Sequence, residues 1–571
     1  MKRIRLLLAI FCVGFHTSAQ FLKTSGQRIV DDNGKEIQLR GLGLGGWMLQ
    51  EGYMLKTADF AGTQHSIKQK IAEVAGKKGM EDFYKAYLKN GITKKDIDSL
   101  AKWGFNSVRL PMHYNLYTLS IEDEPVKGQN TWLEEGFRMT DDLLKWCEAN
   151  RMYLFLDLHA VPGGQGKDAN ISDYDPSKPS VWESEENKAK TAALWKKLAE
   201  RYRNSPWIGG YDIINEPNWN FTGTHPNGCD EKSNAPLRDL QIRITKAIRE
   251  VDQKHIIIIE GNCWGNNYEG MFPLWDENMV LSFHKYWNMN TPQAISGMTS
   301  LREKYNVPVW LGESGENSNV WFTEAISLME SNHIGWAFWP MKKVDNIAGI
   351  CNVKMNPDYA KLLDYWKNGG TKPSEKLAKK ALMQLAEDYK IENTEIRRDV
   401  MDAMFRQVHS DATLPFASNR IPGYIPATAY DLGKNGSAYY DRDTANYRID
   451  TGIDVVWNSG NQLRNDGVDI FWNKADGFYV GKTEAGEWLK YTLDVSKNKD
   501  YILLLDYRND SSQVKNISVS VNGQEKILQL EPGRNVFQNQ HLENIPLHKG
   551  KNIVVLKIMD EGILLKGFSI Q

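Results

Sequence analysis

The feature that most constrains the fold is a repeated alternation of short apolar runs with amphipathic runs of helical period, from about residue 37 to residue 366. The apolar runs have the length and composition of buried strands, and they cover residues 37–43, 105–111, 152–159, 210–216, 255–261, 279–286, 307–313 and 334–340. Helical segments separate most of them, for example residues 139–150, 187–202, 237–251 and 321–331. Eight strand–helix units predict an α/β fold in which parallel strands close into a (β/α)8 TIM barrel.

One unit of this repeat is weak. Residues 262–278 show no helical period, and we expect a loop crossover there. An open, doubly wound parallel sheet is the alternative that the pattern leaves.

The C-terminal quarter of the chain has a different hydrophobic pattern. After a helical stretch at residues 374–409, runs of period two replace the helices, among them residues 447–450, 470–473, 487–495 and 501–508. Turn residues such as Asn522-Gly523 separate them, which is typical of a β-sandwich. We therefore expect a barrel domain over residues 20–412, a linker over 413–424 and a jelly-roll-like β-sandwich over 425–571.

The N-terminus predicts export. Lys2, Arg3 and Arg5 precede a short apolar run at residues 6–15, and small residues follow it, so residues 1–19 resemble a secretory signal peptide. The protein would then be secreted, to the periplasm or beyond, without a membrane anchor. Four cysteines remain after the signal, and their spacing fits neither a zinc site nor a disulfide framework, although one bridge could form.

Composition excludes some partners. The net charge of −2 gives no indication of nucleic-acid binding, and the scattered histidines lack metal-ligand spacing. We expect a monomer with no metal and no cofactor.

Polar and aromatic residues gather where the predicted strands end. In a (β/α)8 barrel the carboxyl ends of the strands carry the chemistry. The residues at these ends are Arg109, His159, Asn215, Glu216, His284, Tyr286, Glu313, Trp336 and Trp339.

Two of these residues are the predicted catalytic pair. Glu216 and Glu313 end the fourth and seventh strands, which we expect to face each other across the barrel, and Pro217 would turn the chain outward after Glu216. Cleavage of a glycoside needs one protonated carboxyl and one ionised carboxylate on a single pocket. Glu260 and Glu316 also lie near strand ends; we expect Glu260 to orient a loop and Glu316 to lie outside the strand.

The motifs that contain these residues resemble glycoside hydrolase family 5, a family of retaining β-glycosidases on a (β/α)8 barrel. They are SVRLP (107–111), LDLHAVPGGQ (156–165), IINEP (213–217), SFHKYW (282–287), LGESG (311–315) and GWAFWP (335–340), in the family's order over about residues 36–345. The resemblance implies that Glu216 is the general acid and then base, and that Glu313 is the nucleophile.

The same resemblance implies the substrate-binding residues. Asn215 would bond the sugar 2-hydroxyl, Tyr286 would touch Glu313, and Arg109 would keep Glu313 ionised. The cleaved sugar would lie between His159 and His284, on a stacking floor formed by Trp339, with Trp336 as its competitor. RGLGLGGWMLQEG (40–52) further resembles the exo-β-1,3-glucanase and β-glucosidase branch, where Glu51 would contact the terminal sugar. Trp47, with Trp264, Trp287 and Trp321, is a candidate for sugar stacking.

The C-terminal domain resembles carbohydrate-binding module family 6 over nearly all of residues 425–571. Lys482 and Leu564 stand where that family usually has an aromatic residue and an asparagine that bind sugar. The sequence therefore allows two interpretations of this domain: a glycan-binding module, or a packing domain that supports the barrel.

Together these features predict a secreted retaining β-glycoside hydrolase whose partner is a polysaccharide or oligosaccharide, a β-glucan or β-glucoside. A β-mannan or other β-linked polysaccharide is the alternative substrate, and a non-catalytic glycan-binding protein is the remaining alternative. Sugar identity would depend on loops at residues 54–92 and 164–185.

Overall fold

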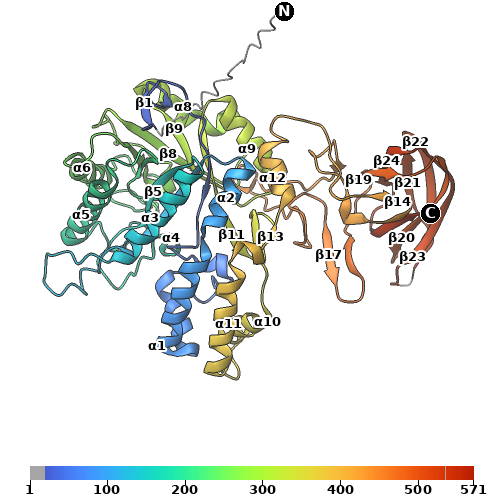
Figure 1. Cartoon of the computed structure of the whole chain (residues 1–571), viewed down its shortest axis with the longest axis horizontal. Helices are drawn as coiled ribbons and strands as arrows, with labels where there is room; N and C mark the ends of the chain where they lie inside the picture. Colours follow the sequence, from blue (N-terminus) through green and yellow to red (C-terminus); the bar gives the residue numbers. More distant parts are fainter. Residues whose placement is uncertain (1–19, 534) are drawn as a thin grey trace, which may run out of the picture.

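The computed structural model describes residues 20–533 and 535–571, so the predicted signal peptide lies outside the described residues. A barrel with helices around it and a smaller sheet-rich domain lie side by side (Figure 1). Within the described residues, no helix has the length and apolar character needed to cross a membrane.

The larger domain is a closed barrel of eight parallel strands in the ring order β10-β3-β4-β5-β6-β7-β8-β9, as the sequence predicts. The strands are β3 (Arg40–Gly43), β4 (Ser107–His113), β5 (Tyr153–Ala160), β6 (Ile208–Asp212), β7 (Ile256–Glu260), β8 (Met279–Lys285), β9 (Val309–Gly315) and β10 (Gly335–Trp339). Closure excludes the open doubly wound sheet, because β10 pairs with both β9 and β3.

Helices surround this ring. They are α2 (Lys94–Trp103), α3 (Glu134–Ala149), α5 (Glu185–Tyr202), α6 (Ala235–Arg249), α8 (Ser296–Tyr305), α9 (Asn319–Ser331) and α12 (Arg398–Phe405), with the short α4 (Ala169–Ser172) and α7 (Asn262–Gly265). The β7–β8 crossover, which the structure describes in full, contains no helix longer than the four residues of α7, so the expectation of a loop there is correct.

The region expected to be a loop at residues 54–92 is mostly helical. It contains α1 (Gln64–Gly91), which begins at a capping box on Thr63 and buries Ile67, Ile71 and Val74. Gly76 adopts a φ of 69° and interrupts its helical geometry. This helix packs against α11 (Glu375–Asp388), and the two project together from the barrel with α10 (Pro357–Asn368) beside them (Figure 1).

Short elements complete this domain. They are β1 (Lys23–Ser25), β2 (Arg28–Val30), β11 (Lys342–Val344), β12 (Cys351–Val353), β13 (Glu395–Ile396), η1 (Gly52–Leu55), η2 (Tyr114–Leu116), η3 (Pro292–Ile295) and η4 (Ile391–Asn393).

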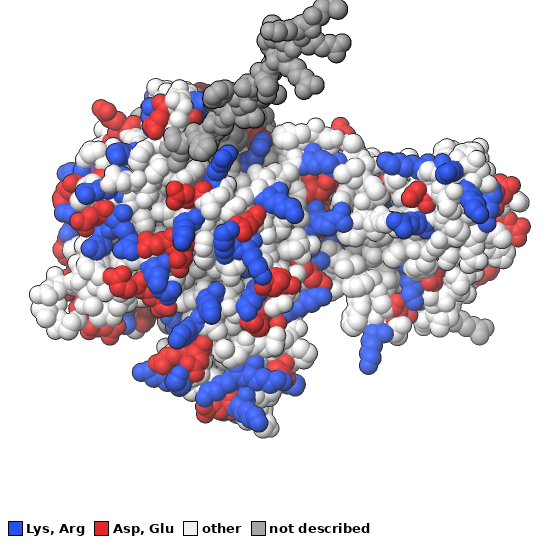
Figure 2. Space-filling model, viewed as in Figure 1, with Lys and Arg blue, Asp and Glu red and all other residues white. Residues whose placement is uncertain are grey.

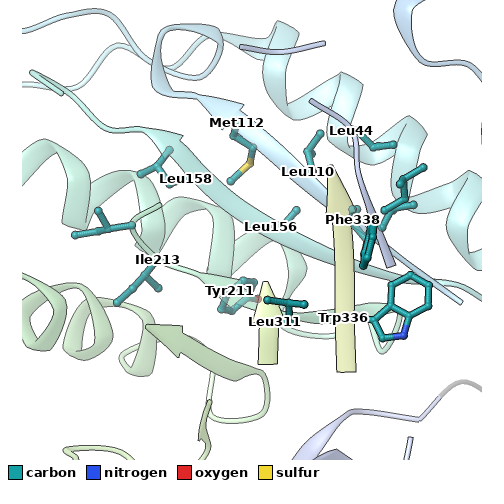
Figure 3. Close-up of a cluster of buried hydrophobic side chains, with 14 of the residues drawn as sticks. Leu44, Leu110, Met112, Leu156, Leu158, Tyr211, Ile213, Leu311, Trp336 and Phe338 are labelled. Atoms are coloured by element: carbon teal, nitrogen blue, oxygen red, sulfur yellow. The ribbon is translucent and has the colours of Figure 1, made fainter. Parts of the chain in front are cut away.

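Apolar side chains pack on both sides of the barrel wall. Leu110, Leu156, Tyr211 and Trp336 belong to the cluster between strands and helices (Figure 3). A separate cluster contains Phe155, Ile256, Ile258, Trp310 and Ala337. These packed strands form the rigid support for the residues at their ends.

The C-terminal domain consists of two six-stranded sheets, as expected for a β-sandwich. One contains β14 (Arg420–Ile421), β16 (Tyr439–Tyr440), β19 (Trp488–Val495), β21 (Lys515–Val521), β22 (Gln524–Leu530) and β24 (Gly550–Ile558). The other contains β15 (Gly423–Pro426), β17 (Ile470–Asn473), β18 (Gly477–Val480), β20 (Lys499–Asn509), β23 (Gln538–Leu547) and β25 (Ile563–Ile570).

Two details of this domain differ from the sequence analysis. The expected linker over residues 413–424 contains β14, which pairs with β19, so strands of the sandwich begin before residue 425. Residues 447–450, expected to be a strand, lie in the helical turn α13 (Arg448–Thr451), and η5 (Ala427–Ala429) is the other short helix.

The surface carries no large field of one sign on the face that Figure 2 shows. Lysine and arginine side chains are interspersed there with aspartate and glutamate, in keeping with the small net charge.

Candidate active site

The two predicted catalytic carboxyls meet at one point of the barrel mouth. One oxygen of Glu216 and one of Glu313 lie within 4.8 Å of each other and of a ring nitrogen of His284. Glu313 lies on β9, whereas Glu216 follows the end of β6 by four residues. These strands are three places apart in the ring of eight, so they do not face each other across its full diameter, as the sequence analysis expected.

Because Glu216 lies beyond its strand, hydrogen bonds hold it in place. Gln165 Nε2 donates to the carbonyl of Asn215 at 2.8 Å, and Asn218 Nδ2 donates to the carbonyl of Glu216 at 2.8 Å. The backbone N–H of Glu216 donates to Glu260 Oε2 at 2.7 Å. Glu216 has a φ of 42°, a conformation that non-glycine residues adopt mainly where the surroundings enforce it.

A single buried arginine connects the carboxylates beneath the pair. Arg109 Nη1 lies 2.9 Å from Glu313 Oε2 and 3.1 Å from Asp157 Oδ2, while Nη2 lies 2.8 Å from Asp212 Oδ2 and 3.0 Å from Glu260 Oε1. The Arg109 side chain is completely buried. The charge-assisted hydrogen bond from Arg109 fixes the position of the Glu313 carboxyl.

The sequence analysis did not predict the contacts of Arg109 with Asp157, Asp212 and Glu260. Asp157 and Asp212 are register partners on β5 and β6, and both are fully buried. A charged residue within an otherwise apolar strand is rarely buried without a partner, and that was the available signal. Glu260 positions the backbone of Glu216.

Glu216 has the properties of a general acid. Burial, reinforced by the nearby Glu313 and Glu260 and opposed by His284, raises the pKa of Glu216 to about 7. His284 Nδ1 lies 2.6 Å from Glu216 Oε1, and its Nε2 lies 3.2 Å from Glu260 Oε1. Burial alone would lower the pKa of His284, but the three carboxyls around it raise that pKa well above its ordinary value. The pair thus has one carboxyl that keeps a proton near neutral pH and one that contacts a guanidinium.

The same three side chains are the only metal-like cluster of histidine, cysteine and acidic residues in the described part of the chain. Their surroundings do not suit a cation. Arg109 contacts Glu313, and the raised pKa of His284 favours a second positive charge there.

A cleft of about 1370 Å³ opens over the pair. Trp339 forms its floor: the indole stacks on His159 at 5.2 Å between ring centroids, and its Nε1 donates to the Tyr53 hydroxyl at 2.8 Å. A Cβ at Gly43 or Gly45 would come within 2.6 Å of this indole, so the glycines of GLGLGG make the room that it occupies. Flat aromatic faces suit the apolar face of a sugar ring.

Most predicted site residues reach this cleft. Glu51, His159, Glu216, His284, Tyr286, Glu313 and Trp339 line it. The Tyr286 hydroxyl donates to Glu313 Oε1 at 2.9 Å, as the resemblance implies. Asn215 and Arg109 are buried beneath the cleft and do not line it, and the Asn215 amide oxygen accepts from Arg109 at 2.7 Å.

Three tryptophan assignments need correction. Trp336 is completely buried in the cluster between strands and helices (Figure 3). Its Nε1 donates to Glu330 Oε1 at 3.2 Å. It is three residues from Trp339, and residues an odd number apart on a strand point to opposite faces. Trp47 is also buried, with its Nε1 donating to the Leu88 carbonyl at 2.7 Å. Trp321 is completely buried as well, with its Nε1 donating to the Asn288 carbonyl at 2.9 Å, and none of the three lines the cleft.

Other residues also line the cleft. Glu316 lies outside β9, as expected, yet it is on the cleft wall, where it pairs with Lys343 at 2.8 Å. Trp264 lines the cleft from the loop that a disulfide between Cys229 and Cys263 fixes, the pair that the sequence could not choose. Trp287, like Trp264 a predicted candidate for sugar stacking, also lines the cleft. Lining residues that the sequence analysis did not predict are Tyr53, Asp168, Arg448 and Ile449.

Comparison with known proteins agrees with this geometry. The model of the family described as cellulase, glycosyl hydrolase family 5, matches residues 31–345, more than half of the chain. The chain belongs to glycosyl hydrolase family 5. The curated relatives include a β-xylosidase of Phanerodontia chrysosporium, which is 27% identical over 60% of this chain and 75% of its own length.

Two further relatives have other names. Endoglucanase C of Acetivibrio thermocellus is 25% identical over 46% of this chain and 88% of its own length. A probable glucan 1,3-β-glucosidase A of Aspergillus clavatus is 26% identical over 43% of this chain and 55% of its own length, so this family 5 chain spans about half of that relative. Among solved structures, the cellulase Cel5C_n is 18% identical with a TM-score of 0.39, covering 63% of this chain and 91% of its own. As a member of glycosyl hydrolase family 5, this chain is a glycosidase.

Proposed function

We propose that the protein is a retaining β-glycoside hydrolase that cleaves β-glucans or β-glucosides by double displacement. The observation that carries the proposal is the pair Glu216 and Glu313: one oxygen of each carboxyl lies within 4.8 Å of the other, the pKa of Glu216 is raised to about 7, and Glu313 contacts Arg109. Retaining enzymes have carboxyls about 5–5.5 Å apart, whereas inverting enzymes need about 6.5–9.5 Å to admit a water molecule.

In the first displacement, Glu313 attacks the anomeric carbon while Glu216 donates its proton to the departing glycosidic oxygen. The carbon–oxygen bond breaks, the leaving sugar departs as an alcohol, and a glycosyl ester on Glu313 forms. Tyr286 and Arg109, which contact the two oxygens of Glu313, orient it for the attack.

In the second displacement, Glu216 is ionised and acts as the base. It takes a proton from water, the water oxygen bonds to the anomeric carbon, and Glu313 departs as carboxylate. His284, 2.6 Å from Glu216, stabilises the carboxylate that Glu216 becomes between the two steps.

Substrate identity is proposed from the relatives and the cleft. The names endoglucanase and glucan 1,3-β-glucosidase support a β-glucan or β-glucoside, and the name β-xylosidase supports a related β-linked sugar. Glu51 supports contact with a terminal sugar, because it lines the cleft together with the catalytic pair. A β-mannan is the alternative substrate for the same chemistry.

We also propose that the protein is exported, which the character of residues 1–19 supports. Glycan binding by the C-terminal sandwich stays a prediction, and so does the contact of Asn215 with the sugar 2-hydroxyl.

The deciding experiment is product analysis on β-1,3-, β-1,4- and β-1,6-glucans, β-mannan, xylan and aryl β-glycosides, with the anomeric form of the first product followed by NMR. We expect hydrolysis of at least one β-glucan or β-glucoside with retained configuration. An inverted first product would reject double displacement, and hydrolysis of mannan or xylan alone would reject the glucan assignment.

A further inference from the structure

The C-terminal domain contributes part of the cleft wall. Its segment from Asn446 to Asp454 leaves the sandwich and reaches the barrel mouth, where the single turn α13 places Arg448 and Ile449 among the cleft-lining residues. The barrel mouth alone therefore does not form the whole substrate cleft.

This segment contacts the loop after β8, which follows the nucleophile's partner Tyr286. The Arg448 guanidinium lies 3.8 Å from the centroid of the Trp287 ring, and the backbone N–H of Ile449 donates to the Trp287 carbonyl at 3.0 Å. The Met289 N–H donates to Asp450 Oδ2 at 2.5 Å. Trp287 Nε1 in turn donates to the carbonyl of Glu316 at 3.2 Å. Arg448 and Trp287 are thus coupled to the loops that carry Tyr286 and Glu316.

Buried amides hold the two domains in one position. Asn317 Nδ2 donates to the Asn446 carbonyl at 2.8 Å, and Asn465 Nδ2 donates to the Asn317 carbonyl at 2.8 Å. Asn319 Nδ2 donates to Asp466 Oδ1 at 2.8 Å. Asn317, Asn319, Asn465 and Asp466 are at most 1% exposed. A buried polar group that lacks its hydrogen-bond partner lowers the stability of the fold. These hydrogen bonds therefore make the docking of the two domains specific, and they fix the position of α13 at the cleft.

The Arg448 side chain retains unused donors. Its flat face covers the Trp287 ring, its side chain is 41% exposed, and its nearest carboxylate within the described residues is Asp454 at 3.9 Å. At that distance Asp454 accepts no hydrogen bond, and no described residue accepts one from the guanidinium. Stacking on an indole fixes the orientation of an arginine while leaving its edge N–H groups available, and sugar hydroxyls are acceptors for such groups.

We propose that Arg448, braced on Trp287, forms a binding subsite for the sugar unit adjacent to the one held between Glu216 and Glu313, so that a residue of the C-terminal domain sets the preference for oligosaccharides over simple glycosides. The inference rests on the proposed function, because it takes the ligand to be the neighbouring unit of a β-linked glycan. It assigns the C-terminal domain a role in substrate selection at the catalytic cleft itself.

The test compares Arg448→Ala with the unchanged enzyme on two substrates of the same sugar: an oligosaccharide that the enzyme cleaves and the aryl β-monoglycoside. We expect the ratio of kcat/KM for the oligosaccharide to that for the aryl glycoside to fall about tenfold, a loss of about 1.4 kcal/mol. The loss should be in KM, with kcat for the oligosaccharide changed much less. Arg448→Lys, which keeps the charge without the planar face, should give an intermediate ratio.

Arg442→Ala is the matched control, since Arg442 belongs to the same domain but pairs with Glu484 and does not line the cleft. Its ratio should equal that of the unchanged enzyme. An unchanged ratio for Arg448→Ala would overturn the inference.

A binding measurement separates this inference from the proposed function. Calorimetry with the oligosaccharide on Glu313→Gln and on Glu313→Gln with Arg448→Ala should show about tenfold weaker binding for the double variant. If the unchanged enzyme cleaves nothing while this difference persists, the hydrolase proposal fails and the subsite stands. Equal dissociation constants, or no binding by either variant, would overturn the subsite.

Discussion

The two walls of the cleft are built in different ways. The barrel rim supplies Glu313 from the strand β9 and Glu216 from a hydrogen-bonded segment after β6, above a buried arginine that contacts four carboxylates. The C-terminal domain supplies one helical turn, from which the side chain of Arg448 is 41% exposed. The proposed bond cleavage depends on groups whose charges are determined by buried contacts inside the barrel. The proposed recognition of a neighbouring sugar uses an exposed side chain, which can be changed without disturbing those charges.

The largest effect should come from the nucleophile. Glu313→Gln removes the group that forms the glycosyl ester, and we expect kcat to fall by roughly 10⁴- to 10⁶-fold, the range found when a covalent nucleophile is lost. The measurement is steady-state hydrolysis of the best substrate of the panel. Glu316→Gln, three residues away on the cleft wall, should lose far less; an equal loss would transfer the nucleophilic role away from Glu313. Azide should restore turnover of Glu313→Gly with an inverted product.

The next largest effect should come from the acid. Glu216→Gln cannot donate a proton, and general acid–base groups contribute about 10²–10⁴-fold. The loss should be near the upper end for an oligosaccharide, whose leaving alcohol needs a proton. It should be smaller in the first step for an aryl glycoside with an acidic phenol. Equal losses on both substrates would contradict the assignment of Glu216.

A smaller effect should appear in the pH profile. Burial raises the pKa of Glu216 from an ordinary value near 4.5 to about 7, and in the proposed mechanism the protonated form is the active one. The value of kcat/KM should therefore be high below pH 7 and fall about tenfold per pH unit well above it. The pH profile of kcat/KM for Arg448→Ala should show the same fall above pH 7, because Arg448 does not contact Glu216. A profile flat to pH 9 would show that Glu216 is not the titrating acid.

The smallest effect on catalysis should come from the domain junction. Asn465→Ala leaves the buried Asn319 amide oxygen and the Asn317 carbonyl without their donor, which should lower the free energy of unfolding by about 1–3 kcal/mol. Thermal or denaturant unfolding measures it, with Asn539→Ala, an exposed amide of the same domain, as the control. No difference between the two variants would contradict a specific docking of the domains.

Much of the barrel could be predicted from the sequence, because its strands are short apolar runs whose ends share one edge. The eight strands and the loop in place of a helix after β7 follow from that pattern. The helix α1 did not, since its apolar residues are sparse and Gly76 interrupts them. Strand parity would have separated Trp336 from Trp339, and buried charges within strands would have indicated Asp157 and Asp212.

Residues 447–450 show what local pattern cannot decide. Tyr447 and Ile449 alternate with polar residues and favour a strand, yet the segment forms a helical turn whose Asp450 and Ile449 bond to the β8 loop. Contacts with a distant part of the chain outweigh local propensity there. The disulfide partners were unpredictable for the same reason, since Cys229 and Cys263 meet only once two loops have folded.

The polar junction between the domains has a practical consequence for anyone who shortens this protein. A barrel expressed without the residues that follow 412 would expose the amides of Asn317 and Asn319, which are buried in the full chain, and would strip one face of Trp287 of its cover. Such a fragment would retain every group that breaks the bond, but its mouth would be wider than that of the intact enzyme, and its substrate range would describe the excised barrel only.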